Sequence, residues 1–83
     1  MDYLLLTQRL GQQIRELRLN RGLTQAGLAD IAGLTRQKVI AVEKGSTFVA
    51  MTAYARVLGA LVCELSVVPA VMPTLEEVQG VFE

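Results

Sequence analysis

The chain has 83 residues, with eight basic and eight acidic side chains and therefore no formal net charge. This length is enough for one small domain, and an apolar content of 52% favours a compact core over a disordered chain. Histidine is absent and Cys63 is the single cysteine, which excludes an internal disulfide, a Cys–His or Ser–His catalytic pair and a metal site of recognisable spacing. We therefore expect no enzyme, no metal and no cofactor.

The charges are unevenly distributed along the chain. Residues 1–45 contain seven Lys and Arg against four Asp and Glu, whereas residues 46–83 contain one Arg against four Glu. The two halves carry +3 and −3, so one face can meet phosphate while the other meets a different partner. No apolar run approaches the roughly 20 residues of a membrane helix, and we expect a cytoplasmic protein without membrane contact.

A first helix is predicted over residues 7–20, where Leu10, Ile14 and Leu17 form an apolar stripe that ends before Arg21 and Gly22. Two short helices follow, near residues 25–32 and 36–44. Thr24 and Thr35 can cap them, and Gly33 can turn the chain between them with a left-handed backbone. The side chains expected to face the core are Leu28, Ala29, Ile31, Leu34, Val39 and Val42. This is the spacing of a helix-turn-helix, whose second helix enters the DNA major groove.

The outward face of that second helix carries side chains that suit DNA. Arg36 can hold guanine O6 and N7, Gln37 can pair with adenine, and Ile40 can touch a thymine methyl. Lys38 and Lys44 can meet phosphates. The competing interpretation is a set of solvated surface side chains, with Ile40 in a partner contact.

A fourth helix is predicted at about residues 48–59, capped by Thr47 and closed by Gly59. Its buried side is expected to hold Phe48, Met51, Tyr54, Ala55 and Leu58, while Arg56 is expected to be a solvated charge.

Residues 61–68 then alternate with the period of a β-strand, which places Leu61, Cys63, Leu65 and Val67 on one face. A single strand leaves its backbone unpaired, so we expect the same strand of a second copy to pair with it across a two-fold axis. A connector, Pro69–Pro73, and a short last helix opened by Thr74 and Glu77 follow.

The pattern L-T-Q-x-x-L-A-x-x-x-G-L-T-x-x-x-V-x-x-x-E-x-G, with the preceding I-R-E-L-R, resembles the Xre family of Cro/CI-type regulators over residues 8–60. The resemblance implies an all-α, lambda repressor-like domain of four or five helices over residues 1–60. Residues 61–83 would add a dimerisation strand and a short helix to the same compact unit. The strand followed by Pro-Thr-Leu-Glu-Glu resembles HipB-type antitoxins, which implies a HipA-type kinase toxin as partner.

The resemblance also assigns roles to single positions. Gln25 matches a glutamine that contacts a DNA phosphate and braces the recognition helix, and Thr35, Arg36 and Gln37 match the start of that helix. Lys44 matches a position that meets the DNA backbone, and Arg18 and Glu43 match a buried ion pair. Two residues depart from the family: Gly27 replaces a glutamate, which should loosen its helix by about 1 kcal/mol, and Ile40 stands where polar side chains are common.

These observations predict a homodimeric transcriptional repressor that binds a palindromic operator with half-sites ~34 Å apart. A more specific version of this prediction is that the repressor is the antitoxin of a toxin–antitoxin pair and autoregulates its operon. The alternatives are a stand-alone Xre-type regulator, such as a phage repressor or a restriction–modification controller protein, an activator that contacts polymerase, and a helical module that binds protein rather than DNA.

Overall fold

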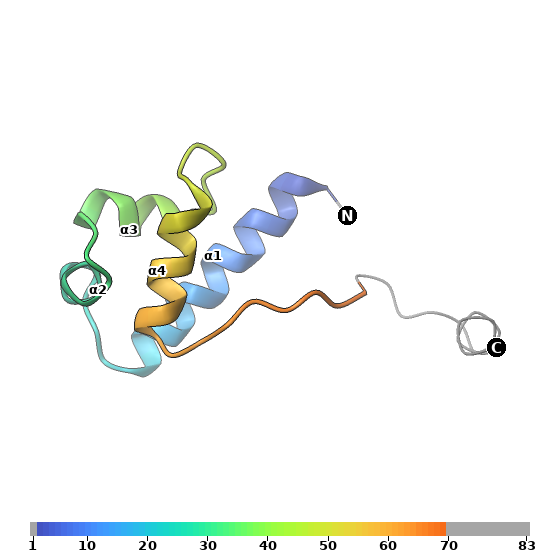
Figure 1. Cartoon of the computed structure of the whole chain (residues 1–83). Helices are drawn as coiled ribbons and strands as arrows, with labels where there is room; N and C mark the ends of the chain where they lie inside the picture. The colour runs from blue at the N-terminus through green and yellow to red at the C-terminus, as the bar shows by residue number, and fades with distance from the viewer. Residues whose placement is uncertain (1, 70–83) are drawn as a thin grey trace, which may run out of the picture.

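A computed structural model describes residues 2–69 of the chain and contains four helices in that range (Figure 1). They are α1 (Tyr3–Asn20), α2 (Gln25–Ala32), α3 (Arg36–Glu43) and α4 (Met51–Ala60). The short helix α3 packs against each of the other three, so it is held from several sides. The predicted all-α domain is therefore confirmed over the described residues.

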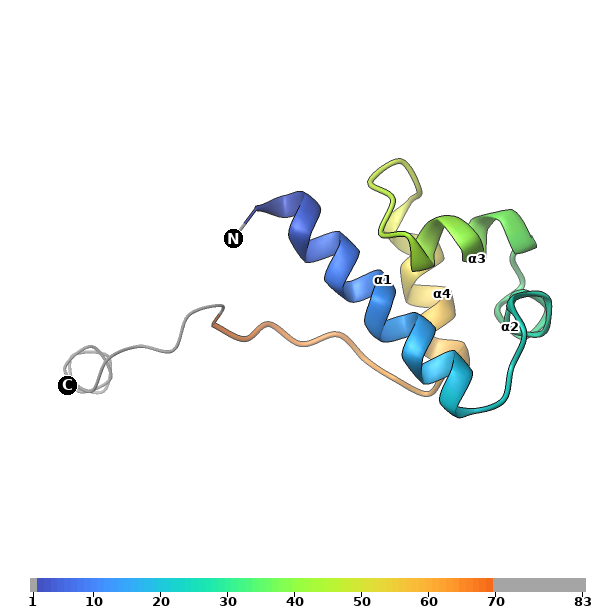
Figure 2. The same ribbon diagram turned by 180° about the vertical axis from the view of Figure 1, so that it is seen from behind.

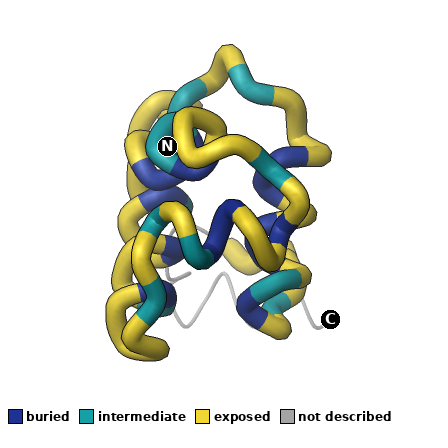
Figure 3. The backbone as a smooth tube through the Cα atoms, turned by 90° about the vertical axis from the view of Figure 1, so that its left-hand side faces the viewer, coloured by how far each residue is buried: buried dark blue, intermediate teal, exposed yellow. Residues whose placement is uncertain are grey.

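The core is formed by side chains from all four helices. Figure 3 marks the buried positions along the backbone of each helix. The buried apolar residues are Ile14, Leu28, Ala29, Ala32, Val39, Val42, Ala53, Tyr54, Val57, Leu58 and Leu61. The prediction for Ile31 was wrong: its side chain is 58% exposed, and Ala32 is the residue of α2 that turns inward instead.

The N-terminal caps of the two short helices are as predicted. The Thr24 hydroxyl accepts a hydrogen bond from the Gly27 amide at 2.9 Å, and the Thr35 hydroxyl accepts one from the Lys38 amide at 3.2 Å. The first helix begins earlier than its apolar stripe indicated, because the Asp2 carboxylate accepts from the Leu4 amide and starts the helix at Tyr3.

All four helices end in the same backbone arrangement, in which two amides beyond the helix bond back to its last carbonyls. A left-handed residue follows each C-terminal turn, and three of these residues are Gly22, Gly33 and Gly45. The fourth is Val62, at φ 57°, whose amide donates to Gly59 while the Cys63 amide donates to Leu58. Gly59 was thus wrongly predicted to close α4: it lies inside the helix.

The start of α4 also differs from the prediction. Its N-cap residue is Ala50, which has no side-chain oxygen, so Thr47 does not cap it. The loop before it is organised by Ser46, whose hydroxyl accepts from the Phe48 amide and whose carbonyl accepts from the Tyr54 hydroxyl at 2.6 Å. This loop turns Phe48 outward, where it is 98% exposed.

Three expectations for the buried side of α4 were therefore wrong. Phe48 belongs to the loop, and Met51 and Ala55 are exposed. With the helix beginning at Met51, its inward face is formed by Ala53, Tyr54, Val57 and Leu58. The prediction for Tyr54 and Leu58 is confirmed.

The predicted strand over residues 61–68 is not formed within the described part of the chain. Leu61 and Val62 make the turn after α4, and residues 63–69 run on in extended form beside α1, in the opposite direction (Figures 1 and 2). A β-ladder needs a second strand, and residues 2–69 of one chain supply none. The predicted last helix lies outside the described residues.

Candidate nucleic-acid interface

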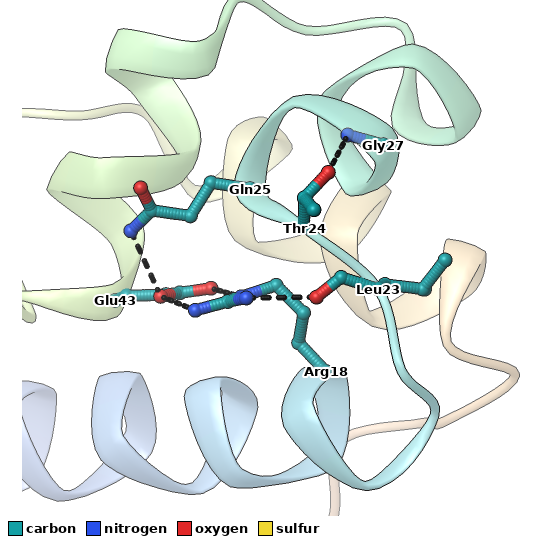
Figure 4. Close-up of polar contacts among 6 residues, drawn as sticks. All are labelled: Arg18, Leu23, Thr24, Gln25, Gly27 and Glu43. Carbon is teal, nitrogen blue, oxygen red and sulfur yellow. Dashed lines mark hydrogen bonds and ion pairs between the residues drawn. The ribbon is translucent and has the colours of Figure 1, made fainter.

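A buried ion pair fixes the C-terminal end of α3 to α1 (Figure 4). The Arg18 guanidinium donates from Nε to Glu43 Oε2 at 2.6 Å and from Nη2 to Oε1 at 3.1 Å. The same guanidinium donates from Nη1 to the Leu23 carbonyl at 2.8 Å, which ties in the segment that leads into α2. This is the ion pair that the family resemblance implied.

Gln25 completes this network from the first turn of α2. Its amide nitrogen donates to Glu43 Oε1 at 3.3 Å (Figure 4). Among the described residues, no buried side-chain nitrogen or oxygen lacks a hydrogen-bond partner. Because a bidentate, fully bonded pair has a narrow choice of geometry, the network sets the position of α3 relative to α1 and α2.

The candidate contact residues lie on the side of α3 that faces away from the core. Thr35, Arg36, Gln37, Lys38 and Lys44 are all exposed. Gln25 and Ile40 are only half-buried. The Gln25 amide nitrogen carries two hydrogens, so its bond to Glu43 leaves one donor for a phosphate. The arrangement can present an arginine and a glutamine to base edges, with lysines beside them.

Close backbone contacts also hold the C-terminal end of α3 against α1. A Cβ on Gly11 of α1 would lie 2.5 Å from the Val42 carbonyl oxygen and 2.6 Å from that of Glu43. A Cβ on Gly45 would lie 2.5 Å from backbone atoms of Thr7 and Gln8. Only glycine at both positions lets α1 cross the end of α3 at this distance.

Arg56 was predicted only as a solvated charge; it is exposed, but it also lies beside the helix-turn-helix, which the sequence did not indicate. Arg56, on α4, lies next to the turn between α2 and α3: its Nη1 is 3.1 Å from the place where a Cβ of Gly33 would be. Arg56 and Lys38 border the same open cleft, whose rim includes Phe48. No local motif signals this proximity, because it depends on how α4 packs across the turn.

The four residues predicted for dimerisation do not share one environment. Leu61 is fully buried in the core of its own chain, so its assignment to a dimer surface was wrong. Cys63 is half-buried and packs against the same core, whereas Leu65 and Val67 are 52% and 101% exposed. The alternating sequence pattern begins at Leu61, but the chain becomes extended only after the left-handed turn at Val62. Leu61 and Cys63 therefore pack against the core, whereas Leu65 and Val67 do not.

Two short helices joined at a left-handed glycine, the second with an exposed basic and amide-bearing face, define a DNA-binding domain. Residues 9–67 match the helix-turn-helix domain family, and the chain belongs to that family.

Comparison with solved structures gives a specific relative. The chain is similar to the restriction–modification controller protein C.AhdI from Aeromonas hydrophila, with 36% sequence identity and a TM-score of 0.67. The match covers 77% of this chain and 93% of that one. A comparison with curated protein sequences found no match. None of the helices within residues 2–69 has the length and apolar character that would let it cross a membrane.

Proposed function

We propose that this chain is a homodimeric, sequence-specific transcriptional regulator of the stand-alone kind, which acts on a palindromic operator near its own gene. The observation that carries the proposal is the exposed face of α3, with Arg36 and Gln37 at its start, on a helix held by the Arg18–Glu43–Gln25 network. A recognition helix needs such support because base contacts depend on positions within a fraction of an ångström.

The similarity to a restriction–modification controller protein supports this form of the proposal over the antitoxin. The antitoxin interpretation depended on the strand and the last helix. The last helix lies outside the described residues, and a strand shared between two copies suits a controller protein as well as an antitoxin.

An apolar surface supports the homodimer. Leu65, Val67 and Val68 are exposed on the extended segment, and Leu4, Leu5 and Leu6 are 44–48% exposed on α1. Of these residues, Leu6, Val67 and Val68 line a groove of about 610 Å³ between the two elements, together with Leu10 and Pro69. A second copy that covers this groove would bury apolar surface that water disfavours. Pairing of residues 63–68 between two copies is the arrangement we favour.

The test is fluorescence anisotropy with the duplex from upstream of the gene and a scrambled duplex, across a salt series. We expect at least ~10³-fold preference for the upstream duplex near physiological salt. Arg36→Ala should lose about 1–3 kcal/mol of discrimination per half-site, while Arg15→Ala, an exposed arginine on α1, should lose little. Equal weak binding to both duplexes, unchanged in Arg36→Ala, would favour the protein-binding module instead.

The homodimer is tested separately by sedimentation velocity. We expect a dimer at micromolar concentration. Val67→Asp should shift it towards monomer, because Val67 is fully exposed in the single chain and a charge there harms only the interface. A wild-type protein that is monomeric at these concentrations and on DNA would contradict the dimer.

A further inference from the structure

An open cleft of about 500 Å³ lies on the flank of α3 that faces α4, away from the Arg18–Glu43 ion pair. It is bordered by the α2–α3 turn, by α3 itself, by the loop before α4 and by the first two turns of α4. The residues that matter for the argument are Gly33, Lys38, Phe48, Ala50, Thr52 and Arg56.

The cleft is basic. Lys38 and Arg56 both border it, and no acidic residue within residues 2–69 does. Neither has a carboxylate within 4 Å among residues 2–69, where the single ion pair is that of Arg18 and Glu43. Two cations that face the same space repel each other unless an anion lies between them, so the cleft suits an anionic ligand.

The position of Arg56 relates the cleft to the recognition helix. Its guanidinium lies against Gly33, the last residue before the segment that leads into α3, where a larger side chain would meet it at 3.1 Å. The turn at Gly33 is three residues from Arg36, the first residue of α3. An anion held by Arg56 would therefore lie beside the DNA that Arg36 is proposed to contact.

We propose that this cleft binds a phosphate of the DNA backbone next to the base pairs contacted by α3, with Arg56 and Lys38 as charged donors and the Thr52 hydroxyl as a neutral one. This inference rests on the proposed function and extends it to α4, outside the helix-turn-helix. An arginine fork can donate two parallel hydrogen bonds to phosphate oxygens, and a lysine adds a point charge. Such a contact positions the protein without reading the sequence.

The first experiment measures how affinity depends on salt. Each phosphate contact contributes about 0.9 to the slope of log K against log salt, so Arg56→Gln should lower the slope by about two in a dimer on two half-sites. The loss should be similar on the upstream and scrambled duplexes, because a backbone contact is independent of sequence. Arg15→Gln is the matched control with the same change of charge, on an exposed site that does not border this cleft. Arg56→Lys should recover most of the slope.

A second pair of variants probes the cleft from α4. Thr52 lies in the first turn of α4, which has no acidic residue, so Thr52→Glu should favour the helix while it repels a phosphate. We expect Thr52→Glu to lower affinity about tenfold or more for both duplexes at low salt, and Thr52→Gln to have a much smaller effect. Unfolding cannot explain this result if the thermal midpoint of Thr52→Glu is unchanged or raised.

The outcomes separate the two proposals. If wild-type protein prefers its upstream duplex but Arg56→Gln and Thr52→Glu keep the wild-type salt slope and affinity, the phosphate site is wrong and the proposed function stands. If wild type shows no preference but its slope still falls in Arg56→Gln, the phosphate site holds and sequence-specific regulation fails. Slopes that fall equally in Arg56→Gln and Arg15→Gln would also overturn the site, since only net charge would then matter.

Discussion

The helix ends in residues 2–45 lie at residues whose types favour them, whereas the helix ends in residues 46–69 do not. In the first region, two threonine caps and three left-handed glycines lie at the helix ends, as their chemistry requires. In the second region, a helix begins at an alanine without a cap and ends at a left-handed valine. The second region is therefore held by packing onto the first, rather than by its own turn residues.

The contrast extends to the surface. α3 is joined to α1 and α2 by a buried ion pair and by two glycines at close approach, whereas its packing against α4 leaves an open cleft bordered by the exposed Phe48. One side of the recognition helix is thus built for rigidity and the other is accessible to a ligand.

The strongest test of the rigid side is Arg18→Ala. It leaves the Glu43 carboxylate buried without its charged partner, which should cost about 3–5 kcal/mol of unfolding free energy. Urea denaturation followed by circular dichroism measures the loss. Arg15→Ala, on the exposed face of the same helix, should change stability by less than about 0.5 kcal/mol. Equal stabilities for the two variants would mean that the ion pair does not hold α3.

A pair of glycine substitutions tests the close approach of α1 and α3. Gly11→Ala places a Cβ within 2.8 Å of three backbone atoms that cannot rotate away, and should destabilise the fold by about 1–3 kcal/mol. Gly59→Ala meets nothing within 4 Å inside α4, and should instead stabilise it by about 0.5–1 kcal/mol. Thermal unfolding of both proteins should therefore give midpoints on opposite sides of the wild type.

The same contrast explains which features the sequence could predict. Caps, turn glycines and the apolar stripes of α1 to α3 depend on near neighbours in the chain, so their residue types predicted those helices and the exposed face of α3. The start of α4 depends on Ser46 and Tyr54, which meet only after the helices pack. The proximity of Arg56 to Gly33 is likewise a tertiary contact, which no spacing along the chain indicates.

The start of the predicted strand was wrong for a related reason. Alternation from Leu61 to Val67 favours an extended backbone, but periodicity cannot specify where a helix stops, and Leu61 is still part of the α4 packing. Whether residues 63–68 pair with a second copy is a property of the dimer, which one chain does not contain. The sequence therefore predicted an extended segment close to its observed position, but it wrongly assigned Leu61, a core residue, to the dimer surface.

Val62→Gly should relieve the backbone strain at the end of α4, where a valine has a left-handed conformation. A β-branched residue at φ 57° is strained by about 1–2 kcal/mol, and Val62 is 86% exposed, so its removal loses little burial. Allowing for the greater freedom of glycine in the unfolded chain, we expect a net stabilisation of about 1 kcal/mol in urea denaturation. Gly22→Val, in the same position after α1 with no atom within 4 Å of its Cβ, should destabilise by a similar amount. If both variants lose stability, the two helix ends are not equivalent.

A similarly small effect is expected at the loop that joins the two regions. Tyr54→Phe removes the hydrogen bond to the Ser46 carbonyl at 2.6 Å and should cost about 1 kcal/mol at pH 7. Burial raises the pKa of Tyr54 above its usual value of 10.0, so the unfolded chain loses this proton at a lower pH than the folded one. Between these two pKa values the unfolded state binds fewer protons, and wild-type stability should therefore fall as the pH rises above about 10. The loss should be smaller in Tyr54→Phe. The unfolding free energies of the two proteins, measured by urea denaturation, should therefore differ less at pH 11 than at pH 7. A constant difference between them across this range would show that Tyr54 ionises alike in both states, and that the loop before α4 is looser than its contact with Ser46 indicates.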